Sequence, residues 1–281
     1  MLEIKNLHKR FGDKEVLKGV DLIVPERGVY GFVGVNGAGK TTTMKIVLGL
    51  LKADEGEVKV NGIPIAYGNT ETNKMIGYLP DVPEYYGYMN CMEYLKFSGE
   101  ICGMDATDCK RRSEELLEMV GLADEKHKIR GFSRGMKQRL GIAQALLHRP
   151  KLLICDEPTS ALDPVGRKDI LDVITTTAEN QDTTVIFSTH ILSDVEHICT
   201  EMALLNNGKI CYSGSIKELK EMHRQQGYII ELENETIENP NGTETEMRQE
   251  VQKLLEKGIR FKKAELMEPS LEKVFMEVVG R

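Results

Sequence analysis

Hydrophobic and polar residues alternate along the first 65 positions in short stretches that predict β-strands. The alternating stretches are residues 2–7, 16–24 and 58–60. Between them, residues 29–33 are apolar throughout, which is typical of a strand buried on both faces of a sheet. A glycine-rich loop follows this run, and residues 42–51 then have the spacing of a helix.

From about residue 83 to residue 150 the apolar residues recur at the spacing of a helix. Leu116, Leu117 and Val120 are one example of this spacing. Two further apolar runs, 152–155 and 184–187, lie on either side of a helical segment at 166–177. Strands that alternate with helices predict a parallel sheet covered on both faces. We therefore expect an α/β fold with a helical subdomain at about 83–150.

The pattern changes again after residue 215. Residues 216–281 are rich in Glu and Lys, and they predict a strand at 228–232, a polar loop at 238–243 and a helix around 247–255, followed by a second strand and helix. We expect two domains, residues 1–215 and a small α+β appendage formed by residues 216–281.

Composition narrows the class of protein. With 281 residues, of which 41% are hydrophobic and 29% charged, the chain has the composition of a folded globular protein. The net charge of −7 argues against a nucleic-acid partner bound through a general basic surface. The longest uncharged stretch, residues 28–39, is shorter than the roughly 20 apolar residues of a membrane-spanning helix. The first residues also lack the apolar segment of a secretory signal, so we expect a cytoplasmic location.

Six cysteines occur without CxxC spacing, which favours reduced thiols over a zinc site or a redox pair.

Residues 34–41, Gly-Val-Asn-Gly-Ala-Gly-Lys-Thr, fit the phosphate-loop (P-loop) pattern GxxxxGK[ST], and they lie between a predicted buried strand and a predicted helix. In this context the glycines let backbone N–H groups converge on phosphate oxygens, and the helix N-terminus attracts anions. We expect Lys40 to reach the β- and γ-phosphates of ATP and Thr41 to ligate Mg²⁺. The other expected nucleotide contacts are Gly34, Asn36, Gly37, Ala38, Gly39 and Thr42.

The apolar run 152–155 ends in two carboxylates, Asp156 and Glu157. Open α/β sheets bind ligands outside the carboxyl ends of their strands, so these side chains are expected near the phosphate loop. Asp156 is suited to hold Mg²⁺ through water, and Glu157 to orient or deprotonate an attacking water. An apolar run followed by Asp-Glu is a weak signal alone, and the phosphate loop makes it strong evidence for a nucleotide site.

Three more motifs carry a resemblance to a known family. Residues 132–139, Phe-Ser-Arg-Gly-Met-Lys-Gln-Arg, resemble the LSGGQxQR signature of ATP-binding cassette (ABC) ATPases. Residues 158–163 resemble the D-loop of that family, and residues 188–190, Ser-Thr-His, resemble its switch histidine. The resemblance covers about residues 1–215, and it implies a P-loop NTPase core with an antiparallel β subdomain and a helical subdomain that carries the signature.

The resemblance also implies a dimer of two cassettes packed head to tail, in which each ATP lies between the phosphate loop of one subunit and the signature of the other. Ser133, Gly135 and the D-loop residue Asp163 would then bind the nucleotide of a second ABC ATPase subunit. Within one subunit, His190 would sense the γ-phosphate and act with Glu157 and Lys40 in catalysis. Phe11 matches the aromatic residue that stacks on adenine in the family, and its alternative role is that of a core residue at a strand end.

Two positions depart from the family pattern. Asp81 stands where a glutamine usually contacts Mg²⁺ or water, and because a carboxylate can also approach a metal, Asp81 is a third candidate metal ligand. Arg134 replaces a signature glycine. It either approaches the phosphates bound by the partner or is a solvated surface arginine.

Five of the nine tyrosines lie between residues 78 and 94, in the region that in this family receives a cytoplasmic helix of the membrane subunit. The alternative is that they pack the core of the helical subdomain, and a docking surface requires at least two of them to be exposed. Residues 269–275 resemble a segment of export-type cassette subunits. The sequence thus predicts an ATPase subunit that drives a separate integral membrane permease, of export type, at the inner face of the cell membrane. The alternative function is that of a soluble ABC ATPase with a regulatory or mechanochemical role.

Overall fold

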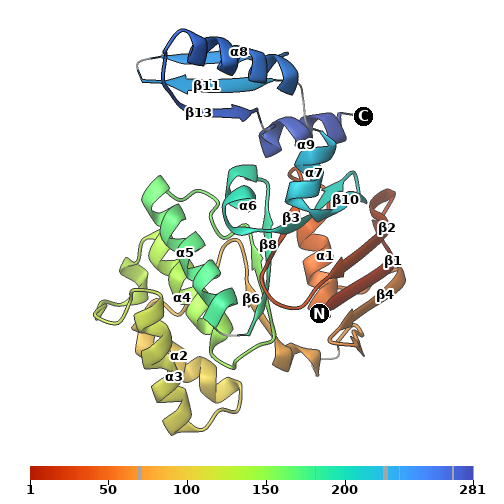
Figure 1. The fold of residues 1–281 in the computed structure, drawn as a ribbon. Helices are drawn as coiled ribbons and strands as arrows, with labels where there is room; N and C mark the ends of the chain where they lie inside the picture. The colour runs from red at the N-terminus through yellow and green to blue at the C-terminus, as the bar shows by residue number, and fades with distance from the viewer. Residues whose placement is uncertain (69–70, 181, 224–226, 234, 268, 281) are drawn as a thin grey trace. The chain divides into compact units, whose positions relative to one another are not determined.

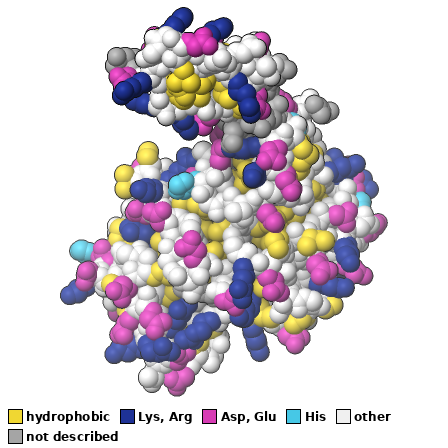
Figure 2. All heavy atoms as spheres, viewed as in Figure 1, with side chains coloured by type: hydrophobic (Ala, Val, Ile, Leu, Met, Phe, Trp, Pro, Cys, Tyr) yellow, Lys and Arg dark blue, Asp and Glu magenta, His cyan; other side chains and the backbone are white. Residues whose placement is uncertain are grey.

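The chain folds as two units, Met1–Gly214 and Ser215–Arg281. The structure is a computed structural model, and it describes residues 1–281 except 69–70, 181, 224–226, 234, 268 and 281 (Figure 1). Among the described residues, none of the helices combines the length and the apolar character needed to cross a membrane. On the visible face of the first unit, acidic and basic side chains are interspersed (Figure 2).

An antiparallel sheet forms one layer of the first unit. Its strand order is β2-β1-β4-β5, with β1 paired to both β2 and β4. The strands are β1 (Leu2–Phe11), β2 (Lys14–Val24), β4 (Glu55–Val60) and β5 (Ile63–Pro64). Leu2 and Ile4 are buried while Lys5 is exposed, because successive side chains of a strand point to opposite faces. The predicted antiparallel β subdomain is therefore present.

A six-stranded sheet of order β10-β9-β3-β8-β7-β6 forms the second layer. Its strands are β3 (Val29–Val33), β6 (Ile76–Leu79), β7 (Leu152–Asp156), β8 (Thr184–Thr189), β9 (Glu201–Asn206) and β10 (Lys209–Ser215). Strands β6, β7, β8, β3 and β9 pair in parallel. Every residue of β3, β7 and β8 is buried, as their uninterrupted apolar runs predict. The carboxyl ends of these three neighbouring strands meet at one edge of the sheet.

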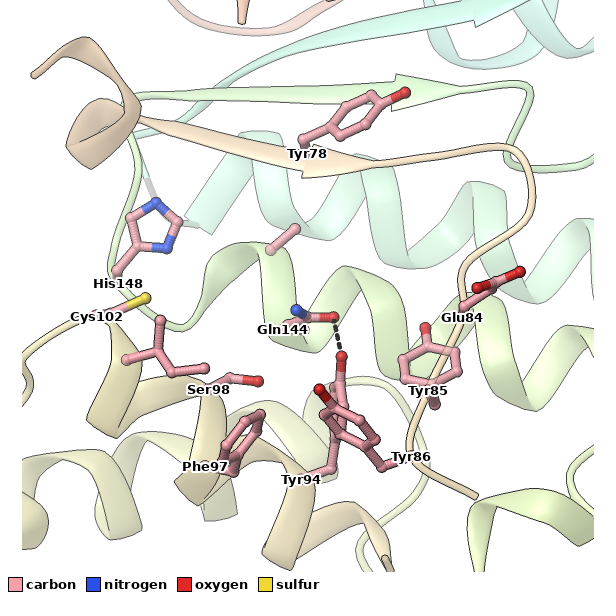
Figure 3. Close-up of a pocket in the computed structure, with 12 residues that line it drawn as sticks. Tyr78, Glu84, Tyr85, Tyr86, Tyr94, Phe97, Ser98, Cys102, Gln144 and His148 are labelled. Atoms are coloured by element: carbon pink, nitrogen blue, oxygen red, sulfur yellow. Dashed lines mark hydrogen bonds between the residues drawn. The ribbon is translucent and has the colours of Figure 1, made fainter. Parts of the chain in front are cut away.

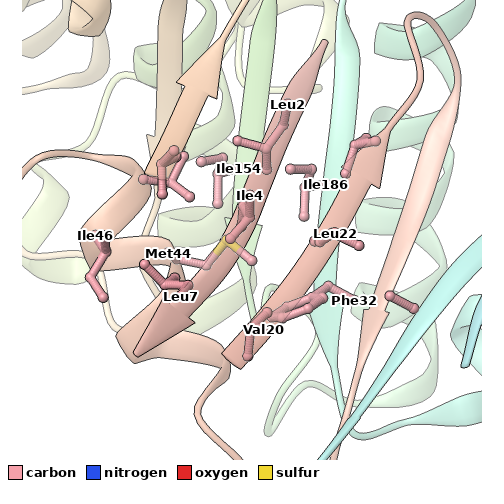
Figure 4. Packing of buried hydrophobic residues seen from close by; sticks show 14 of the residues in the cluster. Leu2, Ile4, Leu7, Val20, Leu22, Phe32, Met44, Ile46, Ile154 and Ile186 are labelled. Atoms are coloured by element: carbon pink, nitrogen blue, oxygen red, sulfur yellow. The ribbon is translucent and has the colours of Figure 1, made fainter. Parts of the chain in front are cut away.

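The hydrophobic core between the two sheets fixes the position of that edge. Ile4 and Leu22 from the antiparallel sheet pack with Phe32, Ile154 and Ile186 from the parallel sheet (Figure 4). Helix α1 (Lys40–Val47) contributes to the same cluster. Burial of each such side chain contributes about 1.5–3 kcal/mol, so the strand and the helix on either side of the phosphate loop are firmly held. Helix α1 is shorter than the predicted 42–51, because the chain turns into a left-handed conformation at Gly49 (φ 67°).

Three helices form the subdomain inserted between β6 and β7. They are α2 (Cys91–Ile101), α3 (Ala106–Met119) and α4 (Arg134–Leu146), and they contact one another. Each has a side-chain N-cap: Asn90 with Glu93 in a capping box for α2, Asp105 for α3 and Ser133 for α4. Short 3₁₀ turns, η1 (Thr72–Met75) and η2 (Ile129–Gly131), lie in the connections. Two more helices follow along the chain, α5 (Pro164–Asn180) and α6 (Leu192–Ile198).

The second unit is a small α+β structure with its own core. Its described elements are α7 (Ile216–Met222), β11 (Tyr228–Leu232), β12 (Thr236–Asn239), α8 (Glu244–Glu256), β13 (Phe261–Leu266) and α9 (Leu271–Val279). The antiparallel sheet β12-β11-β13 packs with α8 around Tyr228, Ile230 and Leu254. The predicted loop at 238–243 begins later than expected, because residues 236–239 pair with β11 as a strand.

Candidate nucleotide-binding site

The phosphate loop joins β3 to α1 through glycines that the backbone requires. Gly37 and Gly39 have left-handed φ angles of 81° and 116°. A Cβ atom at Gly34 would lie 2.5 Å from the carbonyl oxygen of Leu205, and one at Gly39 would lie 2.7 Å from a methyl carbon of Leu17. No side chain of the described residues caps α1, so its N-terminus is left for an anionic ligand.

Lys40, Glu157 and His190 converge at the carboxyl ends of β3, β7 and β8. The buried ammonium group of Lys40 donates to the Gly34 carbonyl oxygen at 2.6 Å and lies 3.0 Å from Glu157 Oε1. His190 Nδ1 donates to Glu157 Oε2 at 2.8 Å. Glu157 holds this position with a left-handed backbone, at φ 50°, directly after the last residue of β7. Glu157 therefore contacts both of the other residues predicted for catalysis, Lys40 and His190.

Asp156 is buried beside them and accepts two hydrogen bonds. The Thr41 hydroxyl donates to its Oδ2 at 2.8 Å, and the Ser188 hydroxyl donates to its Oδ1 at 3.0 Å. Burial raises the pKa of Asp156, and the two hydrogen bonds oppose that rise. Thr41 and Asp156 thus place a hydroxyl and a carboxylate together, the hard oxygen donors that Mg²⁺ prefers. Within the described part of the chain, no group of three or more His, Cys, Asp or Glu side chains is arranged to hold a metal, so a Mg²⁺ ion here needs ligands from the nucleotide and water.

A cleft opens over the phosphate loop, and Asp81 lies on its wall together with Glu157. We call it the phosphate-loop cleft. The lining residues are Lys14, Val16, Asn36, Gly37, Gly39, Lys40, Thr41, Thr42, Asp81 and Glu157. Arg134 reaches Asp81 from the first turn of α4, with its Nη2 3.1 Å from Asp81 Oδ1. The guanidinium that sequence analysis placed either near a partner's phosphates or in solvent is thus paired with the other departure from the family pattern.

The signature and D-loop residues lie apart from the cleft of their own chain. Ser133 caps α4, accepting from the Met136 backbone N–H at 3.2 Å, and Gly135 follows in the first turn of that helix. Asp163 precedes α5 and accepts from the Gly166 backbone N–H at 3.0 Å. None of these three predicted nucleotide-binding residues lines the phosphate-loop cleft.

Phe11, at the end of β1, is 51% exposed, which rules out the alternative role as a core residue. The Lys9 ammonium lies 5.4 Å from the centre of its ring, a cation–π contact. Phe11 does not line the phosphate-loop cleft, although Lys14 and Val16 of the adjacent strand do. An exposed aromatic face is therefore available on the β1–β2 hairpin.

The tyrosines of residues 78–94 divide between the two roles considered for them. Tyr86 and Tyr88 are 50% and 68% exposed, whereas Tyr94 is buried and donates to Gln144 Oε1 at 3.2 Å. Tyr85 stacks edge-on against Tyr94, with ring centroids 5.0 Å apart. All of these tyrosines except Tyr88 line a pocket between α2 and α4, which we call the tyrosine groove (Figure 3). The groove is lined by Tyr78, Glu84, Tyr85, Tyr86, Tyr94, Phe97, Ser98, Ile101, Cys102, Gln144, Ala145 and His148.

A buried polar network lies beside the D-loop, and the sequence did not predict it. Asp194, in the first turn of α6, is only 1% exposed and accepts from the Thr159 hydroxyl at 2.7 Å and from Arg167 Nε at 2.5 Å. Arg167 also donates to the Ser193 hydroxyl at 2.7 Å. An acidic residue in the first turn of a helix is so common that Asp194 carried no separate signal. The network ties the D-loop to the helix that follows His190.

Comparison with known proteins identifies the family to which the chain belongs. A family model described as ABC transporter matches residues 17–160. The chain is 36% identical to an uncharacterised ABC transporter ATP-binding protein, YxlF of Bacillus subtilis, and the match covers 99% of each chain. It is 37% identical to the bacitracin transport ATP-binding protein BcrA of Bacillus licheniformis, over 80% of this chain and 73% of that protein.

Among solved structures, the dimer of an ATP-binding cassette bound to ADP and Pi matches with a TM-score of 0.68 and 26% identity. That match covers 77% of this chain and 99% of the other. The predicted family and fold class are confirmed. Matching motifs, fold and relatives together show that this chain belongs to the ABC transporter family, as an ATP-binding and ATP-hydrolysing subunit.

Proposed function

We propose that the chain binds MgATP in the phosphate-loop cleft and hydrolyses it to drive export through a separate integral membrane permease. The observation that carries the proposal is the convergence of Lys40, Glu157, His190 and Asp156 beside the phosphate loop. Export is supported by the similarity to a protein named for bacitracin transport. The permease would hold the chain at the inner face of the membrane.

The contacts of Glu157 suggest how hydrolysis proceeds. Its two carboxylate oxygens face Lys40 and His190. Phosphate oxygens of ATP attract the Lys40 ammonium, which leaves Glu157 Oε1 to accept a hydrogen bond from water. The water oxygen then bonds to the γ-phosphorus, the bond to the β–γ bridging oxygen breaks, and the water proton passes to Glu157. Thr41 and Asp156, with Asp81 as a third candidate, would hold Mg²⁺, which neutralises charge on the phosphates when bound.

A second copy of the chain, or a second ABC ATPase, would complete each site. Ser133, Gly135 and Asp163 lie outside the cleft of their own chain, and the backbone N–H groups at the start of α4 suit an anion. The similarity to a dimeric cassette bound to ADP and Pi supports this arrangement.

The tyrosine groove is the surface we assign to the permease. Tyr86 lines the groove, and the ring of Tyr88 lies beside it with centroids 5.9 Å apart, so the requirement for at least two exposed tyrosines is met at this surface. Phe97 packs edge-on against Tyr86 with ring centroids 5.5 Å apart. Exposed aromatic side chains beside a groove suit an apolar helix from another protein.

Hydrolysis is tested by Glu157→Gln, which keeps the shape of the side chain and removes the base. ATP hydrolysis should fall by about 10²–10⁴-fold while ATP binding persists, because Lys40 and the loop remain. Light scattering should then show an ATP-dependent dimer. The control is Glu118→Gln, an exposed position of α3. Hydrolysis by Glu157→Gln at the wild-type rate would contradict the role of Glu157.

The permease is tested by affinity capture from gently solubilised cells, followed by mass spectrometry. A multi-span membrane protein should be recovered with the wild type and lost when Tyr86 and Tyr88 are both changed to Ala. Tyr67→Ala removes a tyrosine of similar exposure that belongs neither to the groove lining nor to the Tyr86–Tyr88 ring pair, and it should leave the capture unchanged. Recovery of soluble proteins alone would refute the transport proposal.

A further inference from the structure

The ion pair between Asp81 and Arg134 connects the phosphate-loop cleft to α4. Besides the 3.1 Å contact between the two side chains, the buried Gln138 donates its Nε2 to the Asp81 carbonyl oxygen at 2.8 Å. Four residues further along, the Tyr85 hydroxyl donates to the Lys137 carbonyl oxygen at 2.6 Å. The segment from Asp81 to Tyr85 is thus fastened to the first turns of α4 at both ends.

The Asp81 carboxylate lies where it can interact with charges in the cleft. It shares the cleft wall with Thr41 and Lys40, and half of its side chain is in contact with solvent. Burial raises the pKa of Tyr78 to about 12, and the negative charges of Asp156 and then Asp81 add to that rise. The two carboxylates therefore act on the same neighbouring hydroxyl, so their negative potentials overlap at Tyr78.

Two cations have access to the same carboxylate. Arg134 pairs with Asp81 in the structure, and a divalent metal carried in with a nucleoside diphosphate or triphosphate would be drawn to the oxygen atoms of Thr41, Asp156 and Asp81. A guanidinium bound to Asp81 partly neutralises it and repels a second cation. Metal binding and the ion pair therefore oppose each other.

We propose that Arg134 is a positioning residue that competes with the nucleotide-bound metal for Asp81, so that the ion pair weakens metal–nucleotide binding and is itself weakened by it. The inference rests on the proposed binding of MgATP in the cleft. Both side chains are partly exposed, at 40% and 46%, so the pair is screened by solvent. For an exposed pair we expect an effect of about two- to fivefold on affinity, decreasing as salt is added.

The test measures binding of ADP to the full chain by calorimetry, with Mg²⁺ and then with EDTA. ADP is used because neither hydrolysis nor an ATP-dependent dimer is then involved. Arg134→Gln should bind Mg·ADP about two- to fivefold more tightly than the wild type. In EDTA this gain should be absent, and ADP should bind no more tightly to Arg134→Gln than to the wild type, because the freed Asp81 carboxylate repels the phosphates. In an Asp81→Asn background, Arg134→Gln should have no effect.

Two controls separate this role from a general effect of charge or folding. Arg111→Gln removes the same charge from α3, where Arg111 pairs with Asp108 and Glu115, and it should change neither measurement. Arg134→Lys keeps the positive charge and should restore weaker Mg·ADP binding. A mere loss of structure in Arg134→Gln would weaken ADP binding both with Mg²⁺ and in EDTA, and would overturn the proposal.

The inference is wrong if Arg134→Gln leaves Mg·ADP binding unchanged or weakens it while the wild type binds normally. Failure of the wild type to bind Mg·ADP at all would instead refute the proposed nucleotide site, and this inference with it.

Discussion

Replacing Asp194 by alanine should destabilise the first unit strongly, because the change leaves the buried Thr159 hydroxyl and the partly exposed Arg167 guanidinium without their acceptor. The Thr159 hydroxyl and the Arg167 guanidinium both donate to this carboxylate, at 2.7 Å and 2.5 Å. Removing one member of a buried ion pair costs about 3–5 kcal/mol. Since the Arg167 side chain is partly exposed and can recover water, we expect a loss near the lower end of that range.

The assay is thermal unfolding followed by circular dichroism. For a domain of this size, about 3 kcal/mol corresponds to a decrease in Tm of roughly 6–12 °C. Asp194→Asn keeps the shape of the side chain and one acceptor, so it should lose less, about 1–3 kcal/mol. Asp172→Ala, at an exposed position of α5, is the matched control and should change stability by less than about 0.5 kcal/mol.

A double-mutant cycle shows whether the pair itself accounts for the loss. Arg167→Ala alone leaves the Asp194 charge buried with a single hydroxyl donor, so that variant should also be destabilised. The double variant should lose clearly less than the two single losses added together, because neither charge is then left alone. Additive losses, or an Asp194→Ala variant as stable as the Asp172→Ala control, would refute the reasoning.

Three further changes test other parts of the structure. Burial lowers the pKa of His148 below 6.5, so protonation of this side chain favours the unfolded chain. The free energy of unfolding should therefore fall as the pH drops through about 6.5. Thermal melts at high and low pH should show a smaller fall for His148→Gln than for the wild type. Gly141→Ala should cost about 1–3 kcal/mol in urea unfolding, since the added Cβ would lie 2.5 Å from a Leu79 methyl carbon. Phe11→Ala should weaken ATP binding by about 1–3 kcal/mol in a fluorescence titration if adenine stacks on the exposed ring, and an unchanged affinity would exclude stacking.

Local patterns were sufficient to predict the parts of the fold that depend on neighbouring residues. The run at residues 29–33 has no polar position, and the structure buries all of it in the middle of the parallel sheet. The glycines of the phosphate loop are needed for backbone geometry, so their spacing alone predicts a loop between strand and helix. The convergence of Glu157 and Lys40 then follows because parallel strands end at one edge.

Contacts between distant segments were not predictable in the same way. Arg134 and Asp81 are 53 residues apart, and their pairing depends on how α4 packs against the connection after β6. Each residue alone looks like an ordinary surface charge, and sequence analysis treated them as two separate departures from the family pattern. Asp194 and Thr159 are 35 residues apart and raise the same difficulty. Side-chain hydrogen bonds of this kind carry no periodic signal, unlike the apolar faces of strands and helices.

The segment from Asp81 to Tyr86 gives these distant contacts a common consequence. One end of it lines the phosphate-loop cleft, and the other lines the tyrosine groove. Helix α4 binds both ends, through Arg134 and Gln138 at Asp81 and through a backbone carbonyl at Tyr85. Because a helix moves as a stiff body, we expect a displacement of α4 to affect its contacts with Asp81 and with Tyr85 together. The phosphate-loop cleft and the tyrosine groove are therefore joined by direct contacts within one short segment.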